Sequence, residues 1–270
     1  MYNKNMPHNI PTVLVFSGLD PSGGAGIQAD IEALSSHGCH ACPVVTALTT
    51  QDTNDVKHVE AVDAALLLEQ AKTILNDIEI NAIKIGLVSD IDVIQSIHEI
   101  VSHYNTIPVI FDPVLASGAN TALNTLDVQL AMKKLLFPYT TILTPNSREA
   151  RLLAPHADTL DACAMSLLDD GCEFVLLTGS HEPTEKVCNT LYGNNRKLEQ
   201  FLWPRLDDEY HGSGCTLASS IAGLIAQGNE PLTATLEAQE YSWQSLKNAY
   251  QIGRGQSIPN RFFWVNDDDK

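Results

Sequence analysis

The sequence is short of positive charge. Its 270 residues include 16 lysines and arginines against 33 aspartates and glutamates, a formal net charge of −17 at pH 7. Such a surface repels the phosphates of DNA and RNA, which excludes a general affinity for nucleic acid. A nucleotide is not excluded, because backbone N–H groups and a divalent cation can hold a small polyphosphate.

The sequence also has no apolar run near the roughly 20 residues that span a bilayer. The polar stretch Met1–Pro11 has no signal-peptide core, so we expect a cytoplasmic protein without a membrane contact. Cys39 and Cys42 form a C-x-x-C pair, but no second pair stands at zinc-ribbon spacing. The pair begins an apolar, strand-like run, and we interpret both residues as buried thiols.

No internal repeat, low-complexity tract or linker interrupts the chain. We therefore expect residues 1–270 to form a single domain, with flexible ends at 1–11 and 265–270. Strand-like apolar runs occur at 12–17, 42–48, 82–85, 108–111, 140–143 and 174–177, and helical periodicity at 27–37, 66–75, 91–103, 123–136 and 232–250. This alternation predicts a three-layer α/β/α fold with a mostly parallel central sheet. Segments 187–192 and 198–203 predict an antiparallel hairpin near the end.

The stretch Tyr210–Leu224 contains the strongest functional signal. Gly212 and Gly214 bracket Ser213 directly before an apolar, helix-forming run. Glycine permits a positive φ, and the first N–H groups of a helix lack intrahelical partners, so this turn suits a phosphate or another anion. Cys215 stands at the helix start, where the pKa of a thiol is expected to fall. A glycine-containing helix start with a half-buried thiol explains the same residues equally well.

Polar residues elsewhere follow the predicted strands. Asp20 and Gln51 lie near strand ends, and Asp112 precedes a proline at the carboxyl end of another strand. This is the edge at which α/β sheets usually bind their ligands. Each of these residues is also explained as a turn or capping residue. In the same way, Asn146 is sufficiently explained as the cap of a helix that carries Glu149 in its first turn.

Together these motifs resemble the ribokinase-like superfamily, and more narrowly the hydroxymethylpyrimidine/phosphomethylpyrimidine kinases of thiamine biosynthesis. The segments that carry the resemblance are GLDPSGGAGIQAD (18–30), VTALTTQDT (45–53), KIGLVSD (84–90), DPV (112–114), TPNSREA (144–150) and HGSGCTLASS (211–220). They appear in family order over nearly the whole chain. The resemblance implies ATP-dependent phosphorylation of 4-amino-5-hydroxymethyl-2-methylpyrimidine and then of its monophosphate, with Mg²⁺, by a homodimer.

The resemblance also implies roles for individual residues. Those expected to bind the pyrimidine are Gly18, Asp20, Gln51, Leu87 and Val114, and those expected to handle Mg²⁺ and phosphate are Asp112 and Glu149. Those expected to bind ATP are Asn146, Thr178, Gly179 and Gly214. Gly212, Ser213 and Gly214 match the anion hole of the family. Cys215 matches the catalytic base, which as a thiolate would accept the proton of the substrate hydroxyl.

Two loops depart from the family pattern. Leu115-Ala116-Ser117-Gly118 stands where many relatives have Met and then Lys-Ser-Gly, and Leu177-Thr178-Gly179-Ser180-His181 replaces the frequent Lys-Gly-Gly-His. Both changes remove a lysine, which puts the second phosphorylation in question. A pyridoxal kinase and a catalytically silent sensor of pyrimidine or nucleotide remain as alternatives. A Rossmann-type oxidoreductase is disfavoured, because Gly-Gly-Ala-Gly at 23–26 fails the dinucleotide spacing.

Overall fold

The computed structural model describes residues 10–116, 121 and 123–265. Most of the expected flexible ends fall outside these residues, as do Ser117 and Gly118. The described strands are β1 (Thr12–Leu19), β2 (His40–Gln51), β3 (Val56–Ala61), β4 (Ala82–Ile85), β5 (Val109–Phe111), β6 (Ile142–Leu143), β7 (Phe174–Leu177), β8 (Lys186–Gly193) and β9 (Arg196–Pro204). The helices are α1 (Gly26–Ser36), α2 (Ala64–Asp77), α3 (Ile91–His103), α4 (Leu126–Leu135), α5 (Ser147–Leu153), α6 (Leu160–Asp169), α7 (Ser213–Ala226) and α8 (Pro231–Lys247).

The strands form one sheet in the order β3-β2-β1-β4-β5-β6-β7-β8-β9. The six strands from β2 to β7 in this order are parallel, while β3 at one edge and β8 and β9 at the other are antiparallel. The predicted parallel sheet and the β8–β9 hairpin are confirmed. At the hairpin turn, Asn194 and Asn195 both have positive φ, the geometry that matches the twist of two antiparallel strands.

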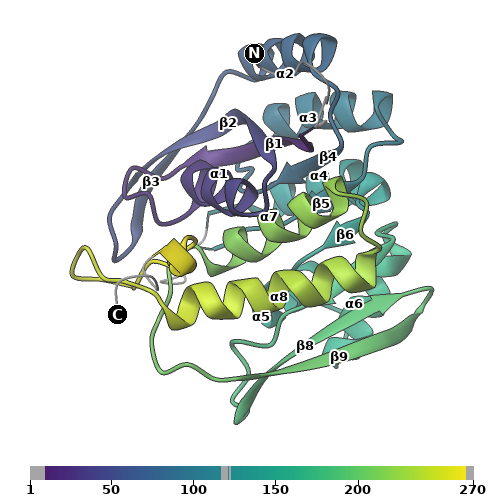
Figure 1. Ribbon diagram of the computed structural model, residues 1–270. Coiled ribbons are helices and arrows are strands. Elements are labelled where there is room, and N and C mark those ends of the chain that lie inside the picture. Colours follow the sequence, from purple (N-terminus) through teal and green to yellow (C-terminus); the bar gives the residue numbers. More distant parts are fainter. Residues whose placement is uncertain (1–9, 117–120, 122, 266–270) are drawn as a thin grey trace, which may run out of the picture.

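Helices cover both faces of the sheet, which gives the three predicted layers (Figure 1). Side chains of α2 to α6 share one hydrophobic core with the sheet, and side chains of α1, α7 and α8 share the other. Strand β1 alternates between the two cores, because Leu14 and Phe16 pack in the first while Val13 and Val15 pack in the second. All four side chains are fully buried, as expected for a central parallel strand.

Helix α3 shows how local sequence sets an element. The side chain of Asp90 accepts hydrogen bonds from the N–H groups of Asp92 (2.8 Å) and Val93 (3.2 Å), which caps the first turn. Apolar residues then recur every three or four positions and are buried against the sheet. The helix spans Ile91–His103, as the periodicity predicts. None of the helices in the described part of the chain is both long and apolar enough to cross a membrane.

The antiparallel pairing of β3 with β2 was not predicted from the sequence. Residues Thr49–Thr53 are polar and read as a loop, and VKHVEA in β3 carries a weak apolar signal. In the structure β2 continues to Gln51, and the side chain of Asp52 organises the turn by accepting from the N–H groups of Asn54 and Asp55. Cross-strand pairing therefore outweighs the local polarity.

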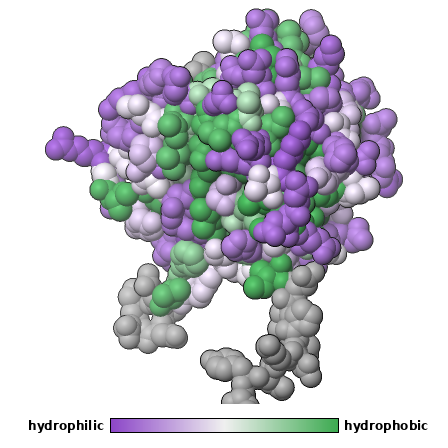
Figure 2. Space-filling view, turned by 90° about the horizontal axis from the view of Figure 1, so that it is seen from above, coloured by the Kyte–Doolittle hydropathy of each residue, from purple (hydrophilic) through white to green (hydrophobic). Residues whose placement is uncertain are grey.

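The two cysteines of the C-x-x-C pair lie on opposite faces of the sheet. Cys39 packs in the core beneath α7, and Cys42 packs in the core on the other side. Both thiols are free and buried, and burial raises the pKa of each. The interpretation as buried thiols is confirmed. At the surface, Figure 2 shows a largely hydrophilic face with apolar side chains in patches between the hydrophilic ones.

Candidate active site

A cavity of about 640 Å³ opens over the carboxyl ends of the parallel strands. Its wall contains residues at or just after the carboxyl ends of β1, β4, β5, β6 and β7. This is the edge at which an open α/β sheet binds its ligands. The cavity wall contains these residues predicted from the sequence: Gly18, Asp20, Gln51, Leu87, Asp112, Val114, Asn146, Glu149, Thr178, Gly212, Ser213, Gly214 and Cys215. Segments far apart in the sequence thus meet in one place.

Gly179 is the exception among the predicted residues. It is absent from the cavity wall, and a Cβ atom at this position would lie 2.2 Å from the carbonyl oxygen of Cys188. Its N–H donates to Oδ1 of Asn189 at 3.0 Å. Glycine is required here because β8 approaches closely, which is a packing reason for this residue, and the expectation that Gly179 binds the nucleotide stays a prediction.

The glycine-rich turn before α7 has the positive φ that glycine permits, at Gly212. Gly212 has a φ of 83°, and a Cβ atom there would lie 2.0 Å from the carbonyl oxygen of Gly24. The first turn of the helix provides N–H groups without intrahelical acceptors. Gly214 is exposed, and a Cβ atom there would lie 3.4 Å from Oδ2 of Asp112. The turn and the carboxylate therefore face the same part of the cavity.

The thiol of Cys215 is protonated in the structure, contrary to the expectation of a thiolate. Its residue surface is half-buried, yet burial of the thiol, helped by the charges of Asp112 and Asp30 and opposed by Lys84, raises its pKa to about 12. In the ligand-free protein the thiol therefore keeps its proton at neutral pH.

Asp112 and Glu149 are buried carboxyl groups in the wall of the same cavity. Burial raises the pKa of Asp112 to about 6, and burial together with the charge of Asp112 raises the pKa of Glu149 to about 8. The oxygens of Glu149 accept from the N–H groups of Asn146 (2.9 Å) and Leu115 (3.3 Å). No cluster of three or more histidine, cysteine, aspartate or glutamate side chains within the described residues is arranged to hold a metal ion.

Asn146 and Glu149 form a complete capping box at the start of α5. Oδ1 of Asn146 accepts from the N–H groups of Arg148 (2.9 Å) and Glu149 (3.0 Å), while the carboxylate of Glu149 accepts from the N–H of Asn146. This is the capping explanation offered by the sequence, and it is confirmed. Both residues also line the cavity, so the cap fixes their positions at its wall.

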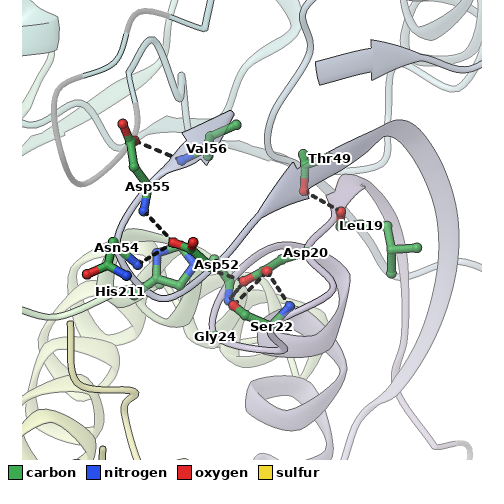
Figure 3. A network of polar contacts seen from close by, with 12 residues as sticks. Leu19, Asp20, Ser22, Gly24, Thr49, Asp52, Asn54, Asp55, Val56 and His211 are labelled. Atoms are coloured by element: carbon green, nitrogen blue, oxygen red, sulfur yellow. Dashed lines mark hydrogen bonds and ion pairs between the residues drawn. The ribbon is translucent and has the colours of Figure 1, made fainter. Parts of the chain in front are cut away.

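Asp20 is held by hydrogen bonds within the protein (Figure 3). Oδ1 accepts from the N–H and the hydroxyl of Ser22, both at 2.7 Å, and Oδ2 accepts from the N–H of Ala25 and from Nε2 of His211, both at 2.8 Å. Burial opposes ionisation, but these bonds and one from Gln51 outweigh it and hold the pKa well below its usual range. Asp20 is therefore chiefly an anchor of the loop between β1 and α1.

His211 is a cavity-wall residue that the sequence did not single out. It stands directly before Gly212, and its ring is hydrogen-bonded to Asp20, so it links the glycine-rich turn to the β1–α1 loop. The ring packs so closely that a Cβ atom at Gly24 would lie 2.4 Å from its Cδ2. The only local signal was its place before the Gly-Ser-Gly turn. Its partner is 191 residues away in the sequence, so spacing alone does not reveal the pair.

Apolar side chains line the same cavity as Asp20 and Gln51. Leu87 and Val114 are half-buried and face the cavity, and Gly18 leaves room for Leu87, whose Cδ2 lies 3.1 Å from the place of a Cβ atom. These residues follow or end β1, β4 and β5, as predicted.

Two further groups were missed. Lys84 is fully buried in β4, and its Nζ donates to Oδ1 of Asp30 at 2.8 Å. At the other end of the cavity the rings of Trp203 and Trp243 stack with their centroids 6.4 Å apart, and Nε1 of Trp203 donates to Oε1 of Gln239 at 3.0 Å. The available signal for Lys84 was a lysine inside an apolar strand. No sequence signal marked the pair of tryptophans.

Comparisons with known proteins identify the family. A model of the phosphomethylpyrimidine kinase family matches residues 20–260. The chain belongs to the phosphomethylpyrimidine kinase family. It is 31% identical over 251 residues to the hydroxymethylpyrimidine/phosphomethylpyrimidine kinase of Escherichia coli, covering 90% of this chain and 94% of that one. It is also 30% identical to the thiamine biosynthesis bifunctional protein ThiED of Geobacter sulfurreducens, of whose length it spans about half, 55%.

Solved structures agree with this family and its fold. The phosphomethylpyrimidine kinase from Clostridium difficile superposes with a TM-score of 0.74 at 32% identity, covering 86% of this chain and 97% of that one. The pyridoxal kinase of Bacillus subtilis, solved as an ADP complex, superposes with a TM-score of 0.86 at 25% identity, covering 95% and 99%. The predicted α/β fold and the predicted resemblance are confirmed.

Proposed function

We propose that this protein is a kinase that uses ATP to phosphorylate 4-amino-5-hydroxymethyl-2-methylpyrimidine and then its monophosphate, for thiamine biosynthesis. One observation carries the proposal. The apolar side chains of Leu87 and Val114, two buried carboxyl groups and a glycine-rich turn line one cavity in a chain of the phosphomethylpyrimidine kinase family. Phosphoryl transfer depends on positioning and charge neutralisation, which these three parts supply.

In this proposal the pyrimidine lies between Leu87 and Val114, with Gln51 at the ring edge. Asp20 holds Gln51 and the β1–α1 loop in place. The hydroxymethyl group points toward Cys215, and the N–H groups of the turn 212–215 stabilise the charge on the transferred phosphoryl group. A bond forms between the substrate oxygen and the γ-phosphorus as the bond from that phosphorus to ADP breaks.

The proton of the substrate hydroxyl passes to Cys215 in this mechanism. The charges of Asp112 and Asp30 help raise the pKa of the thiol, so neutralising Asp112 moves that pKa toward the range of a base. Two buried carboxyl groups with raised pKa values fit a cation. Asp112 would hold Mg²⁺ directly and Glu149, whose oxygens already accept two N–H groups, through water. Bound Mg²⁺ supplies positive charge to the phosphates.

The nucleotide extends along Asn146 and Thr178 toward the paired rings of Trp203 and Trp243. Both rings line the cavity and offer a flat surface on which a base stacks. A cytoplasmic homodimer of single-domain chains completes the proposal, and its oligomeric state is measurable by light scattering.

Product analysis tests the proposal. The pyrimidine alcohol, ATP and Mg²⁺ are incubated with the enzyme, and products are separated by anion exchange and identified by mass spectrometry. Formation of the diphosphate supports both steps. Monophosphate alone limits the activity to the first step and fits the loss of two lysines near 115–118 and at 178. If the added pyrimidine causes no turnover of ATP, that result contradicts the proposal and favours a silent sensor.

Pyridoxal phosphorylation is the second candidate. The superposition on pyridoxal kinase with a TM-score of 0.86 favours it, since that enzyme shares the fold over 95% of this chain. The ratio of kcat/KM for the two alcohols decides between them. We expect the thiamine pyrimidine to have the larger value.

A further inference from the structure

Arg261 is a fully buried arginine whose side chain makes three hydrogen bonds to separate parts of the chain. Its side chain has no exposed surface. Nη2 donates to the carbonyl oxygen of Gly24 at 2.6 Å, Nε donates to Oγ1 of Thr216 at 2.9 Å, and Nη1 donates to Oε2 of Glu32 at 3.0 Å. Arg261 does not line the cavity, so it touches neither proposed substrate.

Two of these partners belong to the anion turn or press against it. Oγ1 of Thr216 also donates to the carbonyl oxygen of Gly212 at 2.8 Å. The carbonyl oxygen of Gly24, which Arg261 binds, is the atom that lies 2.0 Å from the place of a Cβ atom on Gly212. The guanidinium therefore ties the β1–α1 loop and the glycine-rich turn into one unit.

The backbone carbonyl of Arg261 is fixed by side chains of two helices, α1 and α8. Its carbonyl oxygen accepts from the hydroxyl of Ser36 in α1 at 2.7 Å and from the hydroxyl of Tyr241 in α8 at 2.9 Å. The side chain thus extends from a rigid point. A buried guanidinium is costly unless its donors are satisfied, and its planar fork suits three acceptors better than a lysine does.

We infer that Arg261 is a positioning residue for phosphoryl transfer, which holds the β1–α1 loop against the turn 212–214 so that the N–H groups of the turn stay preorganised. This inference rests on the proposed function. Preorganised donors act mainly in the transition state, so loss of Arg261 lowers kcat and leaves KM nearly unchanged.

Arg261→Met tests this inference, with Leu167→Ala as a matched control. Leu167 is fully buried in α6 in the core on the other face of the sheet. Both variants lose thermal stability, but only Arg261→Met loses turnover. We expect kcat to fall by about 10²-fold with KM for both substrates within about threefold, since small misplacements have effects of this size. Equal kcat in the two variants would overturn the inference.

A binding measurement separates this inference from the proposed function. Inorganic phosphate is added, and the rise in melting temperature is recorded for each protein. Wild type and Leu167→Ala should be stabilised by phosphate equally, and Arg261→Met should be stabilised less. This readout needs no kinase activity, so it stands even if product analysis fails. Phosphate stabilisation that is undiminished in Arg261→Met would overturn the inference.

Thr216→Val and Glu32→Gln complete the test if Arg261→Met does not fold. Valine keeps the shape of threonine but removes the hydroxyl that links Arg261 to Gly212, so kcat and phosphate stabilisation should both fall. Glutamine at position 32 still accepts from Nη1 of Arg261, so kcat should stay within about threefold of wild type. Thr216→Val with wild-type kcat and phosphate stabilisation contradicts the inference.

Discussion

Asp20 and Asp112 follow parallel strands at the same cavity and have the same exposure, 5% each, yet their electrostatic states are opposite. Hydrogen bonds to Asp20 lower its pKa, whereas burial of Asp112 raises its pKa to about 6. The difference lies in the donors. Asp20 accepts hydrogen bonds from Ser22, Ala25 and His211. The ionised form of Asp112 is stabilised mainly by the charge of Lys84 and by a hydrogen bond from Thr144.

The comparison separates the scaffold of the site from its reactive part. On the Asp20 wall the protein satisfies its own charge, which fixes the β1–α1 loop and the position of His211. On the Asp112 wall a buried negative charge lacks full compensation, so a cation or a reacting group is stabilised there. Loss of the aspartate should therefore reduce stability more on the first wall and turnover more on the second.

The largest expected effect is on turnover, at the residue beside Asp112. Cys215→Ala removes the proposed proton acceptor and should lower kcat by about 10²–10⁴, with little loss of stability. Steady-state kinetics measure it. Cys188→Ala is the control, because that half-buried thiol lies outside the cavity wall and its loss should leave kcat unchanged. Unchanged turnover in Cys215→Ala would remove Cys215 from this role.

The next effect contrasts the two aspartates directly. In Asp20→Asn the side-chain NH₂ group would face hydrogen-bond donors that need an acceptor. The free energy of unfolding should therefore fall by roughly 2–4 kcal/mol. Asp112→Asn removes a buried charge and should change stability by about 1 kcal/mol or less, in either direction, while abolishing most turnover. Urea unfolding without Mg²⁺ measures both. An equal loss of stability in the two variants would break the comparison.

The sequence predicted the Asp112 wall better than the Asp20 wall. Asp112, Asn146 and Glu149 directly follow buried runs, and local rules for strand ends and capping place them. The state of Asp20 depends on His211, 191 residues away, and no local rule joins the two. Arg261 was missed for the same reason, since its partner Gly24 is 237 residues away.

The pKa of Cys215 was predicted with the wrong sign because the helix start is a local feature, while burial is a tertiary one. The dipole of α7 is visible in the sequence as an apolar run after glycines. The charges of Asp112 and Asp30 beside the thiol appear only when the strands and α1 are assembled. The antiparallel strand β3 also depends on its partner, because VKHVEA is too polar to be recognised alone.

A smaller effect concerns the pH dependence of stability at the Asp112 wall. The pKa of Glu149 is about 8 in the folded protein, above its ordinary value of 4.5, so the folded state binds this proton more tightly than the unfolded chain. Stability is therefore lost as pH rises from 4.5 to 8, by roughly 1 kcal/mol per pH unit, a value reduced because Asp112 shares the effect. Glu149→Gln should flatten this slope.

Urea unfolding of wild type and Glu149→Gln at several values from pH 5 to 8.5, without Mg²⁺, measures this slope. Glutamine loses one acceptor of the capping box, so the variant is offset at every pH, and only the difference in slope is informative. Parallel curves would contradict the raised pKa of Glu149 and would weaken the contrast between the two walls.

The smallest effect on stability is expected at Gln51, which supplies one of several donors to Asp20. Gln51→Met leaves the bonds from Ser22, Ala25 and His211 in place, so the unfolding free energy should fall by about 1 kcal/mol or less. If Gln51 also binds the ring edge, KM for the pyrimidine should rise about tenfold, the equivalent of 1.4 kcal/mol. Thr50→Val, an exposed neighbour on β2 outside the cavity wall, is the control. A loss of stability as large as that of Asp20→Asn would mean that the hydrogen bonds to Asp20 are not redundant, and that its low pKa depends on Gln51 of β2 rather than on the β1–α1 loop.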